Sequence, residues 1–468
     1  MVMKGRGTKA TLFGLAATLA AGLLAGCGSG ASGEQKADNR ITVWTQENLP
    51  PRMEATKKVV RRFEKESGVH VDLVGVDEAQ LPQLIMSAAA AGELPDVIGA
   101  VPMGQVWQMY GNGLLNTQVS RQIVADLNPK TFNANALSLT ADGANRLAVP
   151  SDAWLQLLVY RKDLFEEAGL KPPTTYANAL KAASVLDQGK RDGISLATDP
   201  SDVFTQQSFE DLALANGCRL VDGQGKVTLD SPACRTAFKT YDTLAREHGA
   251  PGTQSVDTTR ATYFSGRSGM MVWSSFLLDE LAGLRSDALP SCPQCKKDPD
   301  FLARNTGIVT SLKGAEGKEP AQFGEITSWA VTRTAETGAS RKFIEYMMGK
   351  GYADWFGMAT EGKIPVRNGT SKDPDAFRKA WRASDMGVDK RRSMQEAYPS
   401  KLGDQLLDGV SRMKRWGLAE GQGALVGATN GELPVAKAIG SMSSGQLSPE
   451  GAAEEAAEEV EALKKSLQ

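Results

Sequence analysis

Hydrophobic residues after position 40 alternate between the spacing of strands and the spacing of helices. The runs ITVW (41–44), VHVDLVGV (69–76) and PDVIGAV (95–101) predict three buried strands, because they are rich in β-branched and other apolar residues. Between them, RMEATKKVVRRFEKESG (52–68) places apolar residues on one helical face, and QLPQLIMSAAAAGEL (80–94) predicts a second helix. The order β-α-β-α-β predicts a parallel sheet covered by helices, in which ligands bind at the carboxyl ends of the strands.

The same alternation continues further along the chain. Residues 155–160 predict a strand that runs into a helix, which Asp163 can cap and Gly169 ends. Thr174 or Thr175 can cap the helix after that. Near the C-terminus, apolar residues follow a Ser-Pro pair at spacings of three and four and predict an amphipathic helix. These apolar residues are Ala453, Ala456, Val460, Leu463 and Leu467.

The chain opens with features of an exported protein. A short basic head and the uncharged stretch 11–26 precede Cys27, and this apolar stretch is shorter than the roughly 20 residues that a membrane span needs. The run Leu-Ala-Gly-Cys that ends at Cys27 resembles the bacterial lipobox, which implies a diacylglyceryl group on the Cys27 thiol. We therefore expect residues 1–26 to be a lipoprotein signal peptide and residues 27–39 a flexible tether. The protein is expected outside the cytoplasm, anchored to the cell membrane through lipid.

Composition describes an ordinary globular body behind this segment. The 468 residues suggest two or three domains, with 41% hydrophobic and 23% charged residues. A formal net charge of −2 gives no electrostatic reason to expect nucleic acid as a partner. No later segment has the uninterrupted apolar length of a transmembrane helix.

Four cysteines remain after Cys27, namely Cys218, Cys234, Cys292 and Cys295. In an exported protein an even set predicts disulfides, and four cysteines allow three connectivities. We favour Cys218–Cys234 and Cys292–Cys295 because each pair is local. A redox CxxC motif at SCPQCKKD and a zinc site made from all four cysteines are the alternatives.

Four later stretches resemble one protein family, in the family's order. They are LAVPSDAWLQLLVYRKDLFEEAGLKPPTTYANALKAA (147–183), TYFSGRSGMMVWSSF (262–276), FGEITSWAVTRTAETGASRKFIEYMMGKG (323–351) and EGKIPVR (361–367). These stretches are similar to motifs of the extracytoplasmic solute-binding proteins of carbohydrate ABC importers, the maltose-binding protein-like group or family 1. The resemblance covers nearly all of the chain after the signal segment.

The resemblance implies the type II periplasmic-binding-protein fold, with two α/β lobes joined by three hinge crossings and a ligand held between them. The crossings are expected near Pro150–Trp154, Glu319–Phe323 and Ile364–Arg367. Lobe one is expected to contain residues 40–150 and 323–364, and lobe two residues 155–320 and 368–468.

The implied ligand is a sugar, which offers hydroxyl groups on its rim and C–H bonds on its faces. Such a site needs flat apolar side chains and hydrogen-bonding side chains in the sugar plane. Candidate stacking residues are Trp44, Trp107, Trp154, Trp273 and Trp329. Candidate hydrogen-bonding residues are Gln46, Glu47, Ser151, Asp152, Ser274, Glu325 and Ser328. Each tryptophan could instead be a core residue, and each polar residue could cap a helix or remain solvated.

Three further residues are interpreted on the same basis. Arg367 could hold an acidic sugar, but we favour a hinge brace because no basic cluster accompanies it. Asp96 matches a common family position and is interpreted as structural. The family's aromatic residue after the Met pair falls at Phe276 here, so either Phe276 or Trp273 could stack on a sugar.

The predicted function is a substrate-binding lipoprotein that captures a mono- or oligosaccharide and delivers it to the membrane permease subunits of an ABC importer. A monomer is expected, with no cofactor, no metal and no enzymatic activity. One alternative keeps the fold but binds an oligopeptide or a polyamine. Another is a lipid-anchored exported glycoside hydrolase; the chain has only His70 and His248, and no G-x-S-x-G, H-E-x-x-H or P-loop motif, but carboxylate glycosidases need none of these. A purely structural surface lipoprotein lacks the support of any repeat or low-complexity segment.

Overall fold

The computed structural model describes residues 39–467. The expected signal peptide and most of the expected tether, with the lipidation site Cys27, lie outside the described residues. Within them, no helix is long and apolar enough to cross a membrane.

The first part of the described chain has the predicted β-α-β-α-β order. Strand β1 pairs in parallel with both β2 and β3, which confirms the parallel sheet. Helix α1 begins at a Pro-Pro pair, buries Val59, Val60 and Phe63 against the sheet, and ends at Gly68, whose left-handed backbone (φ 71°) suits glycine. The elements are β1 (Arg40–Thr45), α1 (Pro50–Ser67), β2 (His70–Gly75), α2 (Leu81–Ala91), β3 (Val97–Pro102) and α3 (Met103–Gly111).

One long strand, β6 (Val149–Arg161), connects two groups of elements. Its first half pairs with β9 (Gly324–Val331) and β10 (Ile364–Pro365), and β9 continues the sheet to β3. Its second half pairs with β7 (Met270–Ser274) and β8 (Thr306–Val309). The predicted strand 155–160 is therefore the second half of a longer strand, because residues before it also find partners in β9.

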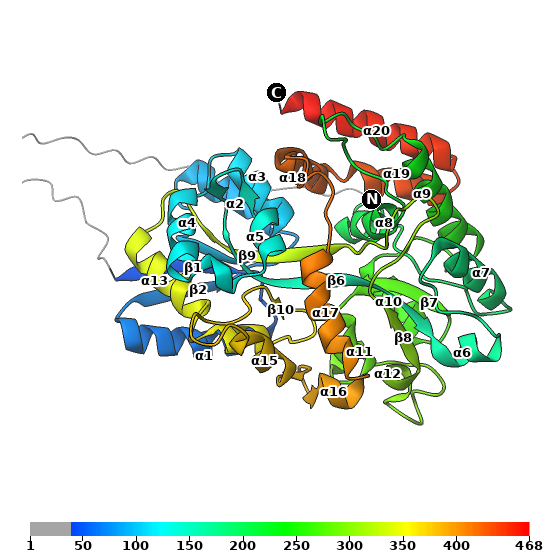
Figure 1. The fold of residues 1–468 in the computed structure, drawn as a ribbon, viewed down its shortest axis with the longest axis horizontal. Coiled ribbons are helices and arrows are strands. Elements are labelled where there is room, and N and C mark those ends of the chain that lie inside the picture. The colour runs from blue at the N-terminus through cyan, green and yellow to red at the C-terminus, as the bar shows by residue number, and fades with distance from the viewer. Residues whose placement is uncertain (1–38, 468) are drawn as a thin grey trace, which may run out of the picture. The chain divides into compact units, whose positions relative to one another are not determined.

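Figure 1 shows β6 and β9 running between two groups of helices, one around α4 and α13 and the other around α7 and α10. The helices before β9 are α4 (Thr117–Asp126), α5 (Ala134–Leu139), α6 (Lys162–Glu167), α7 (Tyr176–Leu186), α8 (Val203–Ala215), α9 (Pro232–Asp242), α10 (Val256–Phe264), α11 (Leu277–Leu281) and α12 (Phe301–Asn305). Those after it are α13 (Thr337–Met347), α14 (Tyr352–Gly357), α15 (Ala376–Arg382), α16 (Met394–Ala397), α17 (Lys401–Arg412), α18 (Gly423–Glu432), α19 (Pro434–Ser443) and α20 (Pro449–Ser466). Two short hairpins complete the fold, β4 (Ala141–Asp142) with β5 (Asn145–Arg146), and β11 (Asp385–Met386) with β12 (Arg392–Ser393).

Of the helix caps predicted from the sequence, the cap at Thr175 is confirmed and the cap at Asp163 is wrong. Thr175 caps α7, since its side chain accepts a hydrogen bond from the Asn178 N–H at 3.2 Å. Asp163 is not the N-cap of α6; it lies in the first turn and holds the Arg161 guanidinium at 2.6 Å instead. The C-terminal helix is confirmed as α20, with its small apolar face buried and Leu467, just beyond it, exposed.

Both local disulfides are present. Cys218 bonds to Cys234 across a separation of 16 residues, and Cys292 bonds to Cys295. All four cysteines are buried, so the bridges are part of the packed interior. With both bridges formed, residues 39–467 contain neither a four-cysteine zinc site nor a free dithiol.

Candidate functional site

The two strands β6 and β9 present polar side chains on one face. Their register pairs Asp152 with Thr327 and Trp154 with Glu325, and residues directly opposite in an antiparallel pair share a face. The other face carries Ala153 and other apolar residues, against which α17 packs. The face with Asp152, Trp154, Glu325 and Thr327, which we call the polar face, is therefore the candidate site.

At one end of the polar face, Lys363 joins two carboxylates that are far apart in sequence. Its Nζ lies 2.6 Å from Glu47 Oε1 and 3.2 Å from Asp152 Oδ1, and all three residues are buried. Arg52 in α1 adds a second ion pair to Glu47 at 3.1 Å. Burial alone would raise the pKa of Glu47, but Lys363 and Arg52 hold it below its usual value. The Glu47 carboxylate is therefore ionised and its charge is compensated.

Both carboxylate oxygens of Asp152 are hydrogen-bonded or ion-paired to other side chains of the protein. It accepts a hydrogen bond from Trp355 Nε1 at 2.6 Å and another from the Thr327 hydroxyl, in addition to the Lys363 contact. The preceding residue, Ser151, donates to the Thr327 carbonyl at 3.0 Å from within a bulge of β6. The structure therefore gives Ser151 and Asp152 a bracing role at the start of β6.

At the other end, Arg415 joins Glu325 to Glu210 of α8. Arg415 forms an ion pair with each carboxylate, the one to Glu210 at 3.2 Å, and all three side chains are buried. Burial lowers the pKa of Arg415, but the two carboxylates raise it above its usual value. Glu325 also accepts a hydrogen bond from the Met103 N–H, the first residue of α3, at 2.9 Å. A buried ion-paired cluster of Arg415, Glu210 and Glu325 therefore lies where α3, α8 and β9 meet.

Trp154 lies between these two charged groups. Its ring is only partly buried and leans on Phe323, with ring centroids 5.7 Å apart. The Arg415 guanidinium lies over the Phe323 ring, 4.6 Å from its centroid. A partly exposed indole beside fixed hydrogen-bonding groups offers a ligand one flat apolar surface and several polar contacts.

Glu78 reaches the same region from the loop after β2. It is exposed, yet partial removal from water raises its pKa, and the charges of Glu325, Glu47, Asp77 and Asp202 raise it further. Because Asp202 is the N-cap of α8, this carboxylate group includes residues from both groups of helices. The carboxyl ends of β1 and β2 therefore face the start of α8 here.

Helices α3 and α18 close the region on a third side. Gly104 in α3 lies directly against the Asn430 side chain, and Asn430 accepts a hydrogen bond from Gln206 of α8 at 2.8 Å. Trp107, also in α3, is buried against Gly423 at the start of α18. These close contacts join the two groups of helices beside the polar face.

The other candidate tryptophans lie apart from Trp154. Trp273 is 6% exposed and has Arg260 over its ring at 5.6 Å, and its Nε1 donates to the Val256 carbonyl at 3.1 Å. Trp329 has no exposed surface and packs against Trp355 with centroids 4.6 Å apart. Trp44 in β1 is partly buried and packs on the core.

The remaining polar candidates are scattered. Ser274 pairs with Gln156 of β6, so it shares the polar face with Trp154 and is nearly buried. Ser328 is fully buried on the other face, and Gln46 is partly buried just after β1. Of the predicted site residues, the structure thus gathers Glu47, Ser151, Asp152, Trp154, Ser274 and Glu325 near the polar face.

Hydrogen bonds support the structural roles predicted for Arg367 and Asp96. Arg367 donates to the Thr131 hydroxyl at 3.1 Å and to the carbonyls of Met348 and Leu127 at 2.5 and 2.9 Å, which is a brace. Asp96 accepts hydrogen bonds from two backbone N–H groups, at 2.8 and 2.6 Å, and ties β1 to the start of α13.

A second buried group of carboxylates lies near Phe276. The Phe276 ring packs directly on the Gly362 backbone and under Arg52, 5.1 Å from the ring centroid. Neighbouring Asp279 and Glu361 are buried, and among residues 39–467 both Asp279 oxygens and Glu361 Oε2 have no hydrogen-bond partner. Burial, followed by the charge of Glu361, raises the pKa of Asp279 well above its usual value.

Glu280, the next residue in α11, belongs to the same group. Arg260 and Arg285 form ion pairs with it at 2.9 and 3.1 Å. Burial outweighs these two cations and raises the pKa of Glu280 to about 7. Glu280 therefore titrates near neutral pH.

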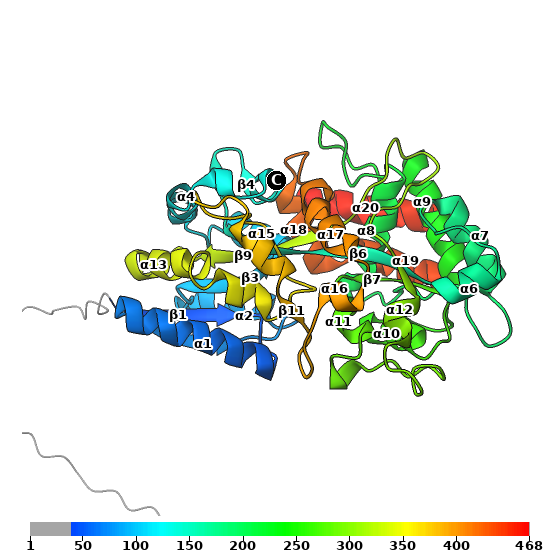
Figure 2. The ribbon, with the colours of Figure 1, turned by 60° about the horizontal axis from the view of Figure 1, so that its bottom comes forward.

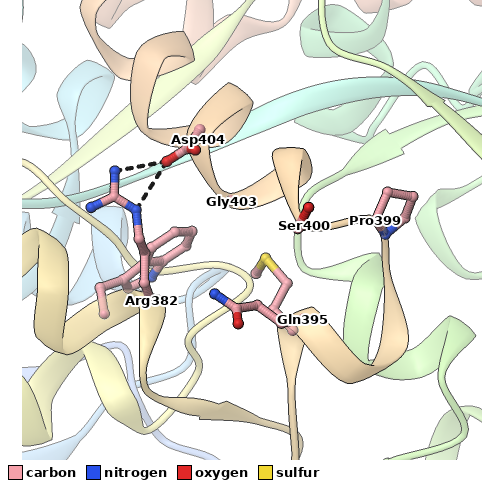
Figure 3. Close-up of a pocket in the computed structure, with 8 residues that line it drawn as sticks. Arg382, Gln395, Pro399, Ser400, Gly403 and Asp404 are labelled. Carbon is pink, nitrogen blue, oxygen red and sulfur yellow. Dashed lines mark hydrogen bonds and ion pairs between the residues drawn. The ribbon is translucent and has the colours of Figure 1, made fainter.

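A small pocket lies elsewhere, between α15, α16 and α17. Figure 3 shows the Arg382–Asp404 ion pair, 2.7 Å long, along one side of it, with Gln395 and Ser400 opposite. Its volume of about 60 Å³ leaves room for a few water molecules only. It is not part of the candidate site.

Residues 58–383 match the family described as bacterial extracellular solute-binding protein. This match spans more than half of the chain. The chain belongs to this family. As the family resemblance in the sequence predicts, this solute-binding protein acts outside the cytoplasm.

Individual relatives extend the likeness beyond the family match. The ABC transporter periplasmic-binding protein YcjN of Escherichia coli K12 is 28% identical over 78% of this solute-binding protein and 82% of its own length. The multiple sugar-binding protein of Streptococcus mutans is 25% identical over 69% of this chain and 75% of its own. The GacH receptor of Streptomyces glaucescens, solved unliganded and with acarbose, has a TM-score of 0.68 at 19% identity, covering 91% of this chain and 98% of that chain. The fold is thus the predicted two-lobed periplasmic-binding-protein fold.

Several residues of the candidate site are not among those that the sequence predicts. Lys363 and Arg415 are buried cations that organise both ends of the polar face, and Glu78 and Glu210 complete its charged groups. A lysine inside the apolar crossing motif EGKIPVR was a usable signal for Lys363. No comparable signal marks Arg415, whose partners are 90 and 205 residues away.

Proposed function

We propose that this solute-binding protein captures a mono- or oligosaccharide between its two lobes and delivers it to the membrane subunits of an ABC importer. The observation that carries the proposal is Trp154, a partly exposed indole set between the buried groups around Asp152 and Glu325. A sugar ring stacked on this indole would have hydroxyl groups within reach of both. The relatives' names, a multiple sugar-binding protein and an acarbose-bound receptor, support the same ligand class.

The proposed lobes follow the strands that connect them. Lobe one comprises residues 40–150 and 323–364, and lobe two comprises residues 155–320 and 368–468. Strand β6 pairs with β9 and β10 up to Leu155 and with β7 and β8 from Gln156 onward, so its partners change at the proposed boundary near Trp154, which supports these divisions. Closure of the lobes on a sugar would be a hinge motion.

Trp154 is the proposed stacking platform, and Glu47, Glu78 and Glu325 are the proposed acceptors for sugar hydroxyls. A charged acceptor makes a stronger hydrogen bond to a hydroxyl than a neutral acceptor does. The buried positions of Trp273 and Trp329 leave them little surface for a ligand. No catalytic role is proposed for these carboxylates.

A thermal-shift screen against a carbohydrate panel tests the ligand class. A ligand at 100 times its dissociation constant stabilises the folded state by about 2.7 kcal/mol, which is a readable shift in melting temperature. At least one saccharide should raise the melting temperature, and incubation with that saccharide should release no new reducing ends. Stabilisation by oligopeptides or polyamines alone would contradict the proposal, and new reducing ends would indicate a hydrolase.

We also propose that Cys27 carries the lipid anchor. The support is the lipobox-like run before it together with the family's extracellular location. Cys27→Ser should release the protein into the medium or leave an uncleaved precursor. Normal processing and membrane retention of this variant would contradict lipid anchoring.

A further inference from the structure

A basic groove runs between α1 and α14 on the outside of the first sheet. Its volume is about 790 Å³, and cationic side chains of α1 line one wall. Figure 2 shows α1 along the outer edge of this group of helices, beside α13. The basic residues of the groove are Lys58, Arg61, Arg62, Lys65 and Arg391.

The charge of this groove is poorly compensated. Lys58, Arg61, Arg62 and Lys65 follow one another at helical spacings, so they share one face of α1 and repel each other. Arg62 has an ion pair with Asp354 at 2.5 Å, whereas the other three have no hydrogen-bond or ion-pair partner among residues 39–467. All four side chains are exposed.

Arg391 adds a fifth cation from the opposite wall. Its guanidinium donates to two carbonyls, of Gly357 and Asp385, each at 2.7 Å. Carbonyl groups hold the side chain in place but do not cancel its charge. The groove contains two carboxylates, Glu54 and Asp354, against five cations, so an anionic partner fits it.

The groove lies close to the point where the described chain begins. Arg40 at the start of β1 pairs with His70, which follows the end of α1 by only a few residues. The proposed anchor Cys27 precedes Asn39 by 12 residues, which span at most about 40 Å. Helix α1, with 18 residues, is about 27 Å long. A protein anchored at Cys27 would therefore keep this groove within reach of the membrane surface.

We propose that the α1–α14 groove docks on anionic lipid headgroups and so orients the protein body on its membrane. This inference rests on the proposed lipid anchoring for its choice of partner. A lipid surface presents many phosphates side by side, which suits a row of cations better than a single small anion does. Attraction of clustered Lys and Arg side chains to an anionic surface increases with their number and is screened by salt.

Vesicle binding of the full chain tests the docking surface. The probe is a set of vesicles of phosphatidylcholine alone or with about one-third phosphatidylglycerol. The readout is the ratio of the two affinities, compared between variants that share the same N-terminal segment with its basic residues, so that the contribution of this segment cancels. The triple variant K58Q/R61Q/K65Q keeps good helix formers in α1 and should lose at least about tenfold of the preference for anionic vesicles. The control K171Q/K181Q/K190Q removes three exposed lysines elsewhere and should keep it.

The outcomes separate this inference from the anchoring and the sugar site. Equal losses in both triple variants, or no preference for anionic vesicles in the parent chain, would overturn the docking surface. Binding of a polyglutamate peptide that is lost in K58Q/R61Q/K65Q, without vesicle binding, would overturn the lipid partner in favour of an acidic protein. Suppression by millimolar inorganic phosphate at constant ionic strength would indicate a free-phosphate site and would likewise overturn it. Sugar affinity and Cys27 processing are measured in separate experiments. A failure of the proposed sugar site or of lipid anchoring can therefore be distinguished from a failure of the docking surface.

Discussion

Removing the Trp154 indole should weaken sugar binding far more than it weakens the fold. Trp154→Ala deletes the partly exposed indole on the polar face and leaves the two ion-paired groups beside it in place. A buried aromatic contact at a binding site contributes on the order of 2 kcal/mol or more, and 1.4 kcal/mol is a factor of ten. We therefore expect affinity to fall by roughly 30-fold.

The stability cost of this variant should be smaller than for a core tryptophan. Replacing a fully packed tryptophan by alanine costs about 3–5 kcal/mol. Trp154 is partly exposed and loses mainly its contact with Phe323, so its cost should lie below that range. Trp273→Ala is the matched control, because Trp273 is 6% exposed and covered by Arg260. It should lower stability and leave affinity nearly unchanged.

The assay combines titration calorimetry with a saccharide from the thermal-shift screen and denaturant unfolding of the same variants. The reasoning would be refuted if Trp154→Ala lost several kcal/mol of stability while the folded fraction bound sugar normally. Trp154 would then be a structural residue. A loss of affinity in Trp273→Ala instead would move the stacking platform to that ring.

Three further predictions concern the buried interactions. Arg415→Met should lower the free energy of unfolding by roughly 3–5 kcal/mol in denaturant titrations, because it leaves Glu210 and Glu325 buried without their cation. The control variant Arg219→Met removes an exposed ion pair and should cost less than about 1 kcal/mol. The double variant C218A/C234A should lose about 3 kcal/mol in the same measurement, since the bridge closes a loop of 16 residues, and an unchanged midpoint would argue against a stabilising role. Glu280 has a pKa of about 7 in the folded state, above that of an unfolded glutamate near 4.5, so the folded state binds the extra proton between these values. Stability should therefore rise as pH falls from 8 to 5, and Glu280→Gln should reduce that slope; an identical slope in the variant would exclude Glu280 as its source.

The sequence predicts the elements of this fold because their signals are local. The strand and helix patterns at the start of the chain, the cap at Thr175 and the C-terminal helix each depend on residues within a few positions of one another. The two disulfides join cysteines that are 16 and 3 positions apart. The family resemblance adds the two-lobed architecture, which no local pattern contains. Asp163 shows the limit of a cap prediction, because the competing Arg161 ion pair takes its carboxylate.

The site is harder to predict because it depends on which strand face a residue occupies. Trp273 pairs with Leu157, and its neighbour Ser274 pairs with Gln156, so one position decides which side chain shares the polar face with Trp154. Trp329 lies four residues beyond Glu325, roughly 13 Å along β9, where Trp355 covers the sheet. Neither fact can be derived from composition or spacing along the chain.

The buried charges were missed for a related reason. Lys363 contacts Glu47, which is more than 300 residues away, and a single sequence gives no sign of such a pair. An isolated lysine or arginine is usually a surface residue, so pattern reasoning assigns it to solvent. The charges at the site are therefore a product of the tertiary fold.

Titration calorimetry of the unmodified protein with a panel of mono- and oligosaccharides tests the central claim most directly. The account predicts saturable binding of at least one saccharide with a stoichiometry of one per chain. It predicts no comparable heat from polyamines or oligopeptides. Failure of every saccharide to bind, together with one-to-one binding of a peptide or polyamine, would contradict the assignment of a sugar to the site around Trp154.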